Sequence, residues 1–407
     1  MKKLNIFILS VCTLCACNVI NNPDNKQKGD PIILKTALQA KVSQDNEFAF
    51  DLLKNTVTNS DETNVVLSPL SVSIALGMAW NGAAGETKSQ IETALKMNNL
   101  STYDINEYYK VMQTSLPNVD PKTQLAIANS LWYKTGFSIK QDFLNLNSTN
   151  FGAYIKELDF DQSWAKDTIN NWCSNKTNGL IPSIVDQISQ DVRLYLINAV
   201  YFKGIWEKQF DKDRTYESRF TDESGNSSEI NMMSMTDTFP YWEDNRAQYI
   251  ELPYGNESFG MTIILPEWGT NITELLDSIT SEKWDSAISD MTSREVRINL
   301  PRFKSECKFT LNQPLKDMGM QLPFTDYADF SGISDDQLTI SQILHKTYVA
   351  VDEDGTEAAA VTAIEFETTS LPDYPTVNVN RPFIFVIRER NTGIILFIGK
   401  MGSVTKY

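Results

Sequence analysis

Histidine is almost absent from this chain of 407 residues, which contains only His345. Zinc sites of the HExxH type and other sites that need two histidines are therefore excluded. A serine or cysteine nucleophile with a histidine base would have to use His345, and no G-x-S-x-G, P-loop or G-x-G-x-x-G motif occurs. Paired carboxylates stay open as a site, because 52 acidic residues provide many chance pairs. We expect no enzymatic activity, no metal and no cofactor, and we interpret His345 as a hydrogen-bonded core residue.

Cysteine is scarce beyond the N-terminus. Three of the five cysteines lie within the first 17 residues, which leaves Cys173 and Cys307 in the rest of the chain. Two cysteines do not make the disulfide framework of a small secreted domain, so the fold must be stabilised by its core. We expect two unpaired thiols, with a single bond between Cys173 and Cys307 as the alternative.

Basic residues are outnumbered, with 36 lysines and arginines against 52 acidic residues and a net charge of −16. Such a charge disfavours binding to phosphate backbones. The basic residues are scattered, and they do not alternate with aromatic residues as on many nucleic-acid-binding surfaces. We therefore expect protein partners and no nucleic acid.

The apolar-rich run at the N-terminus, residues 4–14, is too short to span a bilayer. It follows Lys2 and Lys3, as in a secretory signal peptide. The next residues, "LCAC" at 14–17, resemble a bacterial lipobox, which implies cleavage before Cys17 and diacylation of its thiol. An ordinary secretory signal with incidental cysteines is the alternative.

These features predict the organisation of the N-terminus and the location of the protein. Residues 1–16 are expected to be the lipoprotein signal peptide, and residues 17–39 are expected to be a polar tether. The protein is then exported and lipid-anchored at the bacterial cell envelope, on the outer membrane or the cell surface. Its only contact with a membrane is the lipid anchor.

Helical periodicity is concentrated in the first half of the chain. Ser68 and Pro69 suit the N-cap and the first turn of a helix. The run that follows, "LSVSIALGMAWNGA", is apolar nearly all round, as in a buried helix. Further helices are predicted at 46–57, 85–95, 101–116, 164–178 and 273–291.

Strand-like segments dominate the second half. The run "VRLYLINAVYFKG" (192–204) is almost continuously apolar, which is typical of a central strand covered on both faces. Residues 381–401 have the pattern of a hairpin that turns at Asn391-Thr392-Gly393. Helices first and strands later predict one α+β domain, residues 40–407, with antiparallel sheets. Further strands are predicted at 248–254, 260–266 and 294–303.

The segment from Asp352 to Pro375 lies between two strand-like runs and is too long for a turn. Alternate residues from Thr356 to Thr368 are small or apolar, whereas every charge between these positions lies on the intervening residues. This period of two is that of a half-buried strand. The chain therefore carries an additional strand-like segment between two strands.

This segment resembles the hinge and reactive-centre loop of the serpins in the stretch "VDEDGTEAAAVTA". The resemblance covers about residues 40–407 and implies a serpin fold with three β-sheets, eight or nine helices and an exposed reactive-centre loop. Four other blocks are similar to serpin sequences in the same order: "NVVLSPLSVSIALGMAWNGAAGETKSQI", "LINAVYFKGIWEKQF", "LPRFKSECKFTLNQPLKDMGMQLPFTDYADFSGIS" and "VNRPFIFVIRERNTGIILFIGKM".

The resemblance implies suicide inhibition of a protease. The protease attacks the exposed loop and becomes acylated, and the cut loop then inserts as a strand of the central sheet. Small inward-facing side chains enter a sheet without a charge to desolvate, so this loop suits insertion. A non-inhibitory serpin-fold binding or scaffold protein is the alternative. The hinge residues implied are Glu353, Gly355, Thr356, Glu357, Ala358, Ala359 and Ala360.

The position of the scissile bond follows from the family's spacing. Counting along the loop from the hinge glutamate, Glu353, places the bond between Thr369 and Ser370. A count back from Pro382 suggests a longer loop and leaves neighbouring positions open. These alternatives are Glu367, Thr368 and Leu371.

The residue before the scissile bond selects the class of protease. Thr369 favours elastase-like serine proteases, whose pockets take small side chains. No lysine or arginine lies between Glu353 and Val379, which disfavours trypsin-like proteases. Phe366 keeps chymotrypsin-like proteases open, and cleavage after Glu367 keeps papain-like proteases open. We expect a monomer whose partner is its target protease.

Other family positions carry over individually. Trp206 matches the tryptophan near which the loop first enters the sheet. Four residues match the polar cluster under the central sheet that controls where its strands part. These are Ser68, Ser71, Asn198 and His345.

Overall fold

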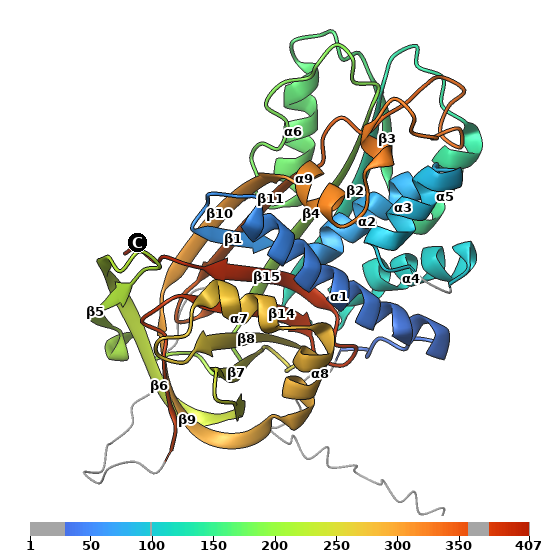
Figure 1. Cartoon of the computed structure of the whole chain (residues 1–407). Helices are drawn as coiled ribbons and strands as arrows, with labels where there is room; N and C mark the ends of the chain where they lie inside the picture. The colour runs from blue at the N-terminus through green and yellow to red at the C-terminus, as the bar shows by residue number, and fades with distance from the viewer. Residues whose placement is uncertain (1–28, 98–99, 357–373, 407) are drawn as a thin grey trace, which may run out of the picture.

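The structure, a computed structural model, describes residues 29–97, 100–356 and 374–406. These residues form nine α-helices and fifteen strands in three sheets (Figure 1). The predicted α+β class is confirmed, and the three predicted β-sheets and the predicted number of helices are present among these residues. Most of the sheet pairings are antiparallel, but β2–β3 and β13–β9 are parallel.

Every predicted helical segment contains helix, but the helix over 46–57 begins ten residues earlier, at Thr36, and the helices at 141–151 and 312–317 were not predicted. The segment 273–291 forms two helices, because Asn271 and Thr280 each cap a separate N-terminus with their side-chain oxygens. The helices are α1 (Thr36–Thr58), α2 (Pro69–Trp80), α3 (Gly85–Ala94), α4 (Thr102–Ser115), α5 (Gln141–Phe151), α6 (Ala165–Lys176), α7 (Ile272–Ser278), α8 (Ser281–Asp290) and α9 (Asn312–Asp317).

The predicted buried helix is α2, and its side chains are buried on every side except at Ala75. Ser68 occupies the N-cap position as expected, but its side chain makes no capping hydrogen bond. Its backbone N–H instead donates to the imidazole of His345. Ser68 is thus tied to a distant strand as well as to its own helix.

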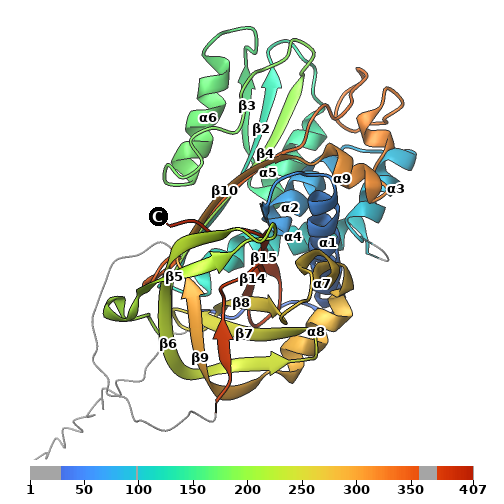
Figure 2. The ribbon, with the colours of Figure 1, turned by 60° about the vertical axis from the view of Figure 1, so that its left-hand side comes forward.

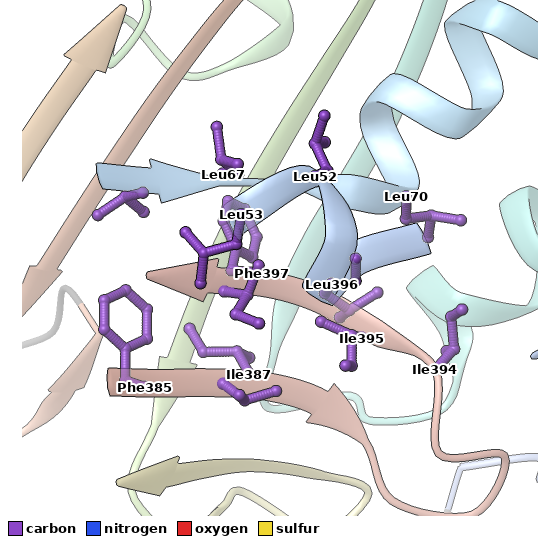
Figure 3. Close-up of a cluster of buried hydrophobic side chains, with 14 of the residues drawn as sticks. Leu52, Leu53, Leu67, Leu70, Phe385, Ile387, Ile394, Ile395, Leu396 and Phe397 are labelled. Atoms are coloured by element: carbon purple, nitrogen blue, oxygen red, sulfur yellow. The ribbon is translucent and has the colours of Figure 1, made fainter. Parts of the chain in front are cut away.

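The largest sheet has nine strands and packs against α1. Figure 3 shows apolar side chains of α1 and β1 meeting those of β14 and β15, including Leu53, Leu67, Phe385 and Phe397. The strands run in the order β1 (Asn64–Leu67), β15 (Ile395–Met401), β14 (Phe383–Glu389), β8 (Phe259–Pro266), β7 (Ala247–Tyr254), β6 (Ser227–Glu243), β9 (Thr292–Pro301) and β13 (Thr376–Asn378), and β5 (Tyr216–Thr221) pairs with β6.

The other two sheets lie side by side, as Figure 1 and Figure 2 show. No ladder joins β4 to β11 within the described part of the chain. The two sheets are connected through β12, which follows β11 in the chain and pairs with β4. One sheet has the order β12 (Gly355–Thr356), β4 (Leu194–Ile205), β2 (Gln124–Lys134) and β3 (Tyr154–Leu158), and the other consists of β10 (Phe303–Thr310) and β11 (Leu344–Val351).

The folded body begins upstream of residue 40. Helix α1 starts at Thr36, and the preceding Ile32 and Leu34 are buried in the core. The Asn391 side chain donates to the carbonyl of Ile32. The last residues of the segment expected to be a tether therefore pack against the domain. Within the described residues, no helix combines the length and the apolar character that a membrane span requires.

Candidate functional site

The start of the predicted hinge is already part of a sheet. Gly355 and Thr356 form β12 and pair antiparallel with Ile205 and Gly204 at the end of β4. Gly355 has φ +149°, and a Cβ there would lie 2.1 Å from the carbonyl oxygen of Gly204, so only glycine fits. The Thr356 side chain is buried, and its hydroxyl lies 2.8 Å from the hydroxyl of Tyr254. The hinge thus enters the sheet with a small residue facing inward.

Trp206, the residue predicted to lie near the loop entry, holds the chain at this point. Its indole N–H donates to the carbonyl of Asp352 over 2.9 Å, and its backbone N–H donates to the carbonyl of Asp354 over 3.0 Å. The indole ring stacks on the ring of Tyr254, with centroids 4.3 Å apart. Trp206 therefore fixes the backbone just before β12.

Two acidic residues of the hinge are paired with basic residues from other elements. Glu353 is buried and accepts hydrogen bonds from Arg302, whose Nη2 lies 2.6 Å away, and from the hydroxyl of Thr215. Burial alone would raise the pKa of Glu353, but these hydrogen bonds outweigh it and hold the pKa below its usual value. Asp354 pairs with Lys212 at 2.9 Å. The hydrogen bonds from Arg302 and Thr215 thus keep Glu353 charged beside the start of the loop, and Lys212 forms an ion pair with Asp354 there.

Loss of the Arg302 guanidinium should destabilise the intact protein. In Arg302→Met the carboxylate of Glu353 would stay buried without its cation, which should lower the free energy of unfolding by about 1–3 kcal/mol. Lys308→Met is the matched control, because its partner Asp186 is 73% exposed. The control should change the free energy by less than about 0.5 kcal/mol. Equal effects of the two substitutions in denaturant unfolding would contradict this role for Arg302.

A cavity of about 350 Å³ lies between β4 and β11. It is near the start of β4, away from the end of β4 that pairs with β12. The beginning of β4, the start of β11 and helix α2 all line it. Ser71, Asn198 and His345 are among its lining residues. The two strands therefore enclose space where neither is hydrogen-bonded to the other, and each leaves one edge available to an added strand.

The polar cluster predicted under the sheet forms two hydrogen-bonded pairs. The backbone N–H of Ser68 donates to His345 Nε2 over 2.9 Å, and the hydroxyl of Ser71 donates to Asn198 Oδ1. Each pair ties α2 or its N-cap to one of the two strands that flank the cavity. The cluster thus connects both strands to the same helix.

Sequence reasoning missed one member of this cluster, Asn129 of β2. Asn198 Nδ2 donates to Asn129 Oδ1 over 2.5 Å, and Asn129 Nδ2 donates to the carbonyl of Phe151 over 2.7 Å and to Gln113 Oε1. The sequence did contain one indication of this role, because Asn129 is a polar residue within the apolar run "LAIANSLWY". A buried amide in such a run needs specific partners.

The comparisons with known proteins agree with this geometry. The protein-family model "Serpin (serine protease inhibitor)" matches residues 43–404. This chain belongs to the serpin family. Serpins are in general protease inhibitors rather than enzymes.

Individual serpins resemble this one over most of their length. Iripin-8 of Ixodes ricinus is 34% identical over 393 residues, which cover 91% of this chain and 98% of that protein. Intracellular coagulation inhibitor 2 of Tachypleus tridentatus is 32% identical over 378 residues, which cover 90% of each chain. The thermophilic serpin tengpin in its native state has 36% identity and a TM-score of 0.84, with 93% of this chain and 97% of that chain covered.

One structural relative is known as a binding protein. Human thyroxine-binding globulin, in complex with thyroxine, has 26% sequence identity to this serpin and a TM-score of 0.82. The match covers 90% of this chain and 99% of that one. The same fold therefore also occurs in a protein named for ligand binding.

The burial of His345 makes the stability of this serpin pH-dependent. Burial lowers the pKa of its imidazole to about 4, well below the unfolded value of about 6.5. The neutral ring accepts from the N–H of Ser68, and a protonated ring could not. The associated stability is complete above pH 6.5 and is lost as the pH falls from 6.5 towards 4.

This pH dependence can be isolated, because His345 is the single histidine. Between pH 7 and pH 5 the wild type should lose about 2 kcal/mol of unfolding free energy through this residue. His345→Asn should lack that component, although it is less stable at pH 7. Denaturant unfolding of both proteins at the two pH values provides the difference. An identical pH dependence in wild type and variant would show that His345 does not titrate in this range.

Several predicted site residues lie outside the described residues. These are the lipidation residue Cys17, the distal hinge residues Glu357, Ala358, Ala359 and Ala360, and the candidate cleavage positions Glu367, Thr368, Thr369, Ser370 and Leu371. The described hinge residues Glu353, Gly355 and Thr356, by contrast, lie together beside Trp206.

Cys173 and Cys307 are free and buried in this serpin. Burial raises the pKa of Cys173 to about 12 and also raises that of Cys307, so both thiols stay protonated. The expectation of two unpaired thiols is therefore confirmed. No group of three or more potential metal-binding side chains occurs among the described residues.

Proposed function

We propose that this serpin is a suicide-type inhibitor that traps elastase-like serine proteases as a covalent acyl complex. The observation that carries the proposal is the position of β12. The hinge has begun to pair with β4, and beyond it β4 and β11 share no ladder within the described residues. A strand that continued from Thr356 would find an open edge on each side.

The proposed reaction uses the protease's own chemistry. Its catalytic serine attacks the carbonyl of Thr369, and the peptide bond breaks so that the amino group of Ser370 leaves with a proton. The protease remains attached through an ester to Thr369. Insertion of the loop then carries the ester and the protease along the sheet before water can hydrolyse the ester. Inhibition therefore depends on insertion being faster than deacylation.

The proposed preference for elastase-like enzymes rests on the loop sequence. Thr369 presents a small side chain, and the absence of lysine and arginine from 354–380 disfavours trypsin-like enzymes. Chymotrypsin-like proteases acting at Phe366 are a secondary possibility. Papain-like proteases acting after Glu367 are another, and cleavage this early leaves a shorter segment to insert.

A panel of proteases tests the proposal. The mature chain is mixed with pancreatic elastase, trypsin, chymotrypsin or papain and analysed on a denaturing gel, and the released C-terminal peptide is weighed. We expect a denaturant-resistant band at the summed mass with elastase, none with trypsin, and a peptide that begins at Ser370. Elastase whose catalytic serine has been blocked should form no band. Cleavage by every active protease without any such band would refute the inhibitory function.

We also propose that Cys17 carries a lipid that holds this inhibitor, as a monomer, at the bacterial cell envelope. The basis is the "LCAC" sequence behind the short apolar run. Cys17→Ala should move the protein from the membrane fraction to the soluble fraction. An unchanged distribution would contradict the lipid anchor.

A non-inhibitory binding protein is the second candidate. The structural likeness to thyroxine-binding globulin favours it, because that protein binds thyroxine. Insertion of the loop distinguishes the two candidates. A loop that is cut without any gain in thermal stability would favour the binding function.

A further inference from the structure

A second cavity, of about 310 Å³, lies where α4, α5, β2, β3 and α6 meet. It shares no lining residue with the cavity between β4 and β11. Ile127 and Ala128 of β2 and Phe151 of α5 form an apolar part of its lining. Its volume is at the lower end of the range that suits a small organic ligand.

One wall of this cavity is aromatic. The ring of Tyr154 is stacked with that of Trp172 at 6.4 Å and an interplanar angle of 20°. Trp132 packs against both rings, at 5.5 Å from Tyr154 and 6.3 Å from Trp172. The indole N–H of Trp172 is buried and has no acceptor among the described residues. The wall therefore offers a flat apolar surface and an unused hydrogen-bond donor.

The lining also carries two lysines and no acidic residue. Lys110 lies on α4 and Lys176 is the last residue of α6, and both are exposed. Neither ammonium group forms a hydrogen bond or an ion pair within the described residues, whereas many other lysines of this acidic chain pair with carboxylates. The cavity is therefore locally basic on a protein with a net charge of −16.

We propose that this cavity is a regulatory site for a small organic anion with a flat aromatic or polycyclic body, such as an aromatic carboxylate. The apolar body lies against Tyr154 and Trp172. The anionic group lies towards Lys110 and Lys176. An acceptor atom of the ligand accepts a hydrogen bond from the indole N–H of Trp172. Each of the three ligand features has a counterpart in the lining.

The cavity is connected to the predicted site of loop insertion by hydrogen bonds. Gln113, Asn129 and Phe151 line it, and both Gln113 and the carbonyl of Phe151 accept from Asn129. Asn129 in turn accepts from Asn198, which accepts from Ser71. Asn198 and Ser71 line the cavity between β4 and β11. The two cavities thus share one chain of polar side chains.

The walls of the anion site belong to two groups of elements. Strands β2 and β3 are in the sheet of β4, whereas α4 and α5 lie outside it. A ligand that contacts both groups resists movement of the β4 sheet relative to the helices. Provided that the proposed inhibitory function holds, the bound anion therefore slows loop insertion and diverts the serpin towards turnover as a substrate.

Binding is tested with 2-naphthoate on the mature chain by isothermal titration calorimetry. Its neutral analogue 2-naphthamide should bind about tenfold more weakly or not at all, and Lys110→Met/Lys176→Met should weaken 2-naphthoate binding by a similar factor. Lys35→Met/Lys122→Met is the matched control, since it removes two exposed lysines that do not line the cavity. Trp172→Phe should keep the stacking surface and also bind more weakly. Absence of binding, or equal affinity in both lysine double variants, would overturn the site.

Regulation is tested with the same ligand during inhibition of elastase. Saturating 2-naphthoate should raise the number of serpin molecules consumed per protease trapped, and this effect should disappear in Lys110→Met/Lys176→Met. Site-specific binding without any change in that ratio would overturn the regulatory role. If no protease were trapped even without ligand, the inhibitory function would fail, while the calorimetry would still decide whether the anion site exists.

Discussion

Replacing Thr356 by arginine is expected to abolish trapping of the protease while leaving cleavage of the loop intact. Thr356 is buried in β12, with its hydroxyl 2.8 Å from that of Tyr254. An arginine there would have to bury a charge without a partner and would exceed the available space. Insertion would slow at its first step, and deacylation would release the protease.

The fraction of cleaved serpin that forms a covalent complex with elastase is the measurement. In Thr356→Arg it should fall at least tenfold, whereas Thr356→Ser, which keeps the hydroxyl and the small volume, should stay near the wild type. The first-order rate at which elastase cleaves the intact loop should be similar in all three proteins. An unchanged yield of complex in Thr356→Arg would contradict insertion through this position.

Cutting the loop is expected to raise thermal stability strongly. An inserted segment of about 12 residues would add roughly 15 ladder hydrogen bonds to β4 and β11, each with a net contribution of about 0.5–1.5 kcal/mol. The sum, about 8–20 kcal/mol, is comparable to the stability of a whole domain. With at most about 2 °C per kcal/mol in a chain of this size, the unfolding temperature should rise by roughly 10–40 °C.

Thermolysin is a suitable protease for this cut, because a metalloprotease forms no acyl intermediate that could be trapped. Calorimetry of the intact and nicked proteins gives the shift. Nicked Thr356→Arg is the control, since the same bond is cut but insertion is blocked at the hinge. A nicked wild type that melts at the temperature of the intact protein would show that the loop does not enter the sheet.

Local patterns in the sequence predicted much of the fold. The apolar run at 69–80 depends only on which residues are buried, and burial leaves a direct mark on sequence. The resemblance to serpins added Trp206 and the cluster around Asn198, which periodicity does not reveal. Because several blocks of the sequence are similar to serpin sequences in the same order, the resemblance also predicted how the helices and strands are connected.

The missed features depend on contacts between distant residues. Arg302 and Lys212, which pair with the hinge acids, lie 51 and 142 residues from their partners, so neither has a local pattern. The strand-like run at 192–204 looked continuously covered, yet β4 alternates between buried and half-buried residues. The open edge of β4 towards β11 depends on which strands pair with each other, and strand propensity does not predict that pairing.

Hydrogen exchange of β4 and β11 before and after the loop is cut tests the central claim most directly. In the intact protein, no ladder joins β4 to β11 among the described residues, whereas β4 is paired with β2 and β11 with β10. After cleavage with thermolysin, we expect the cavity-facing amides to exchange about tenfold more slowly or slower still, with no change in the β14–β8 pair as an internal reference. Unchanged exchange on both edges of the cavity would contradict insertion of the loop between β4 and β11.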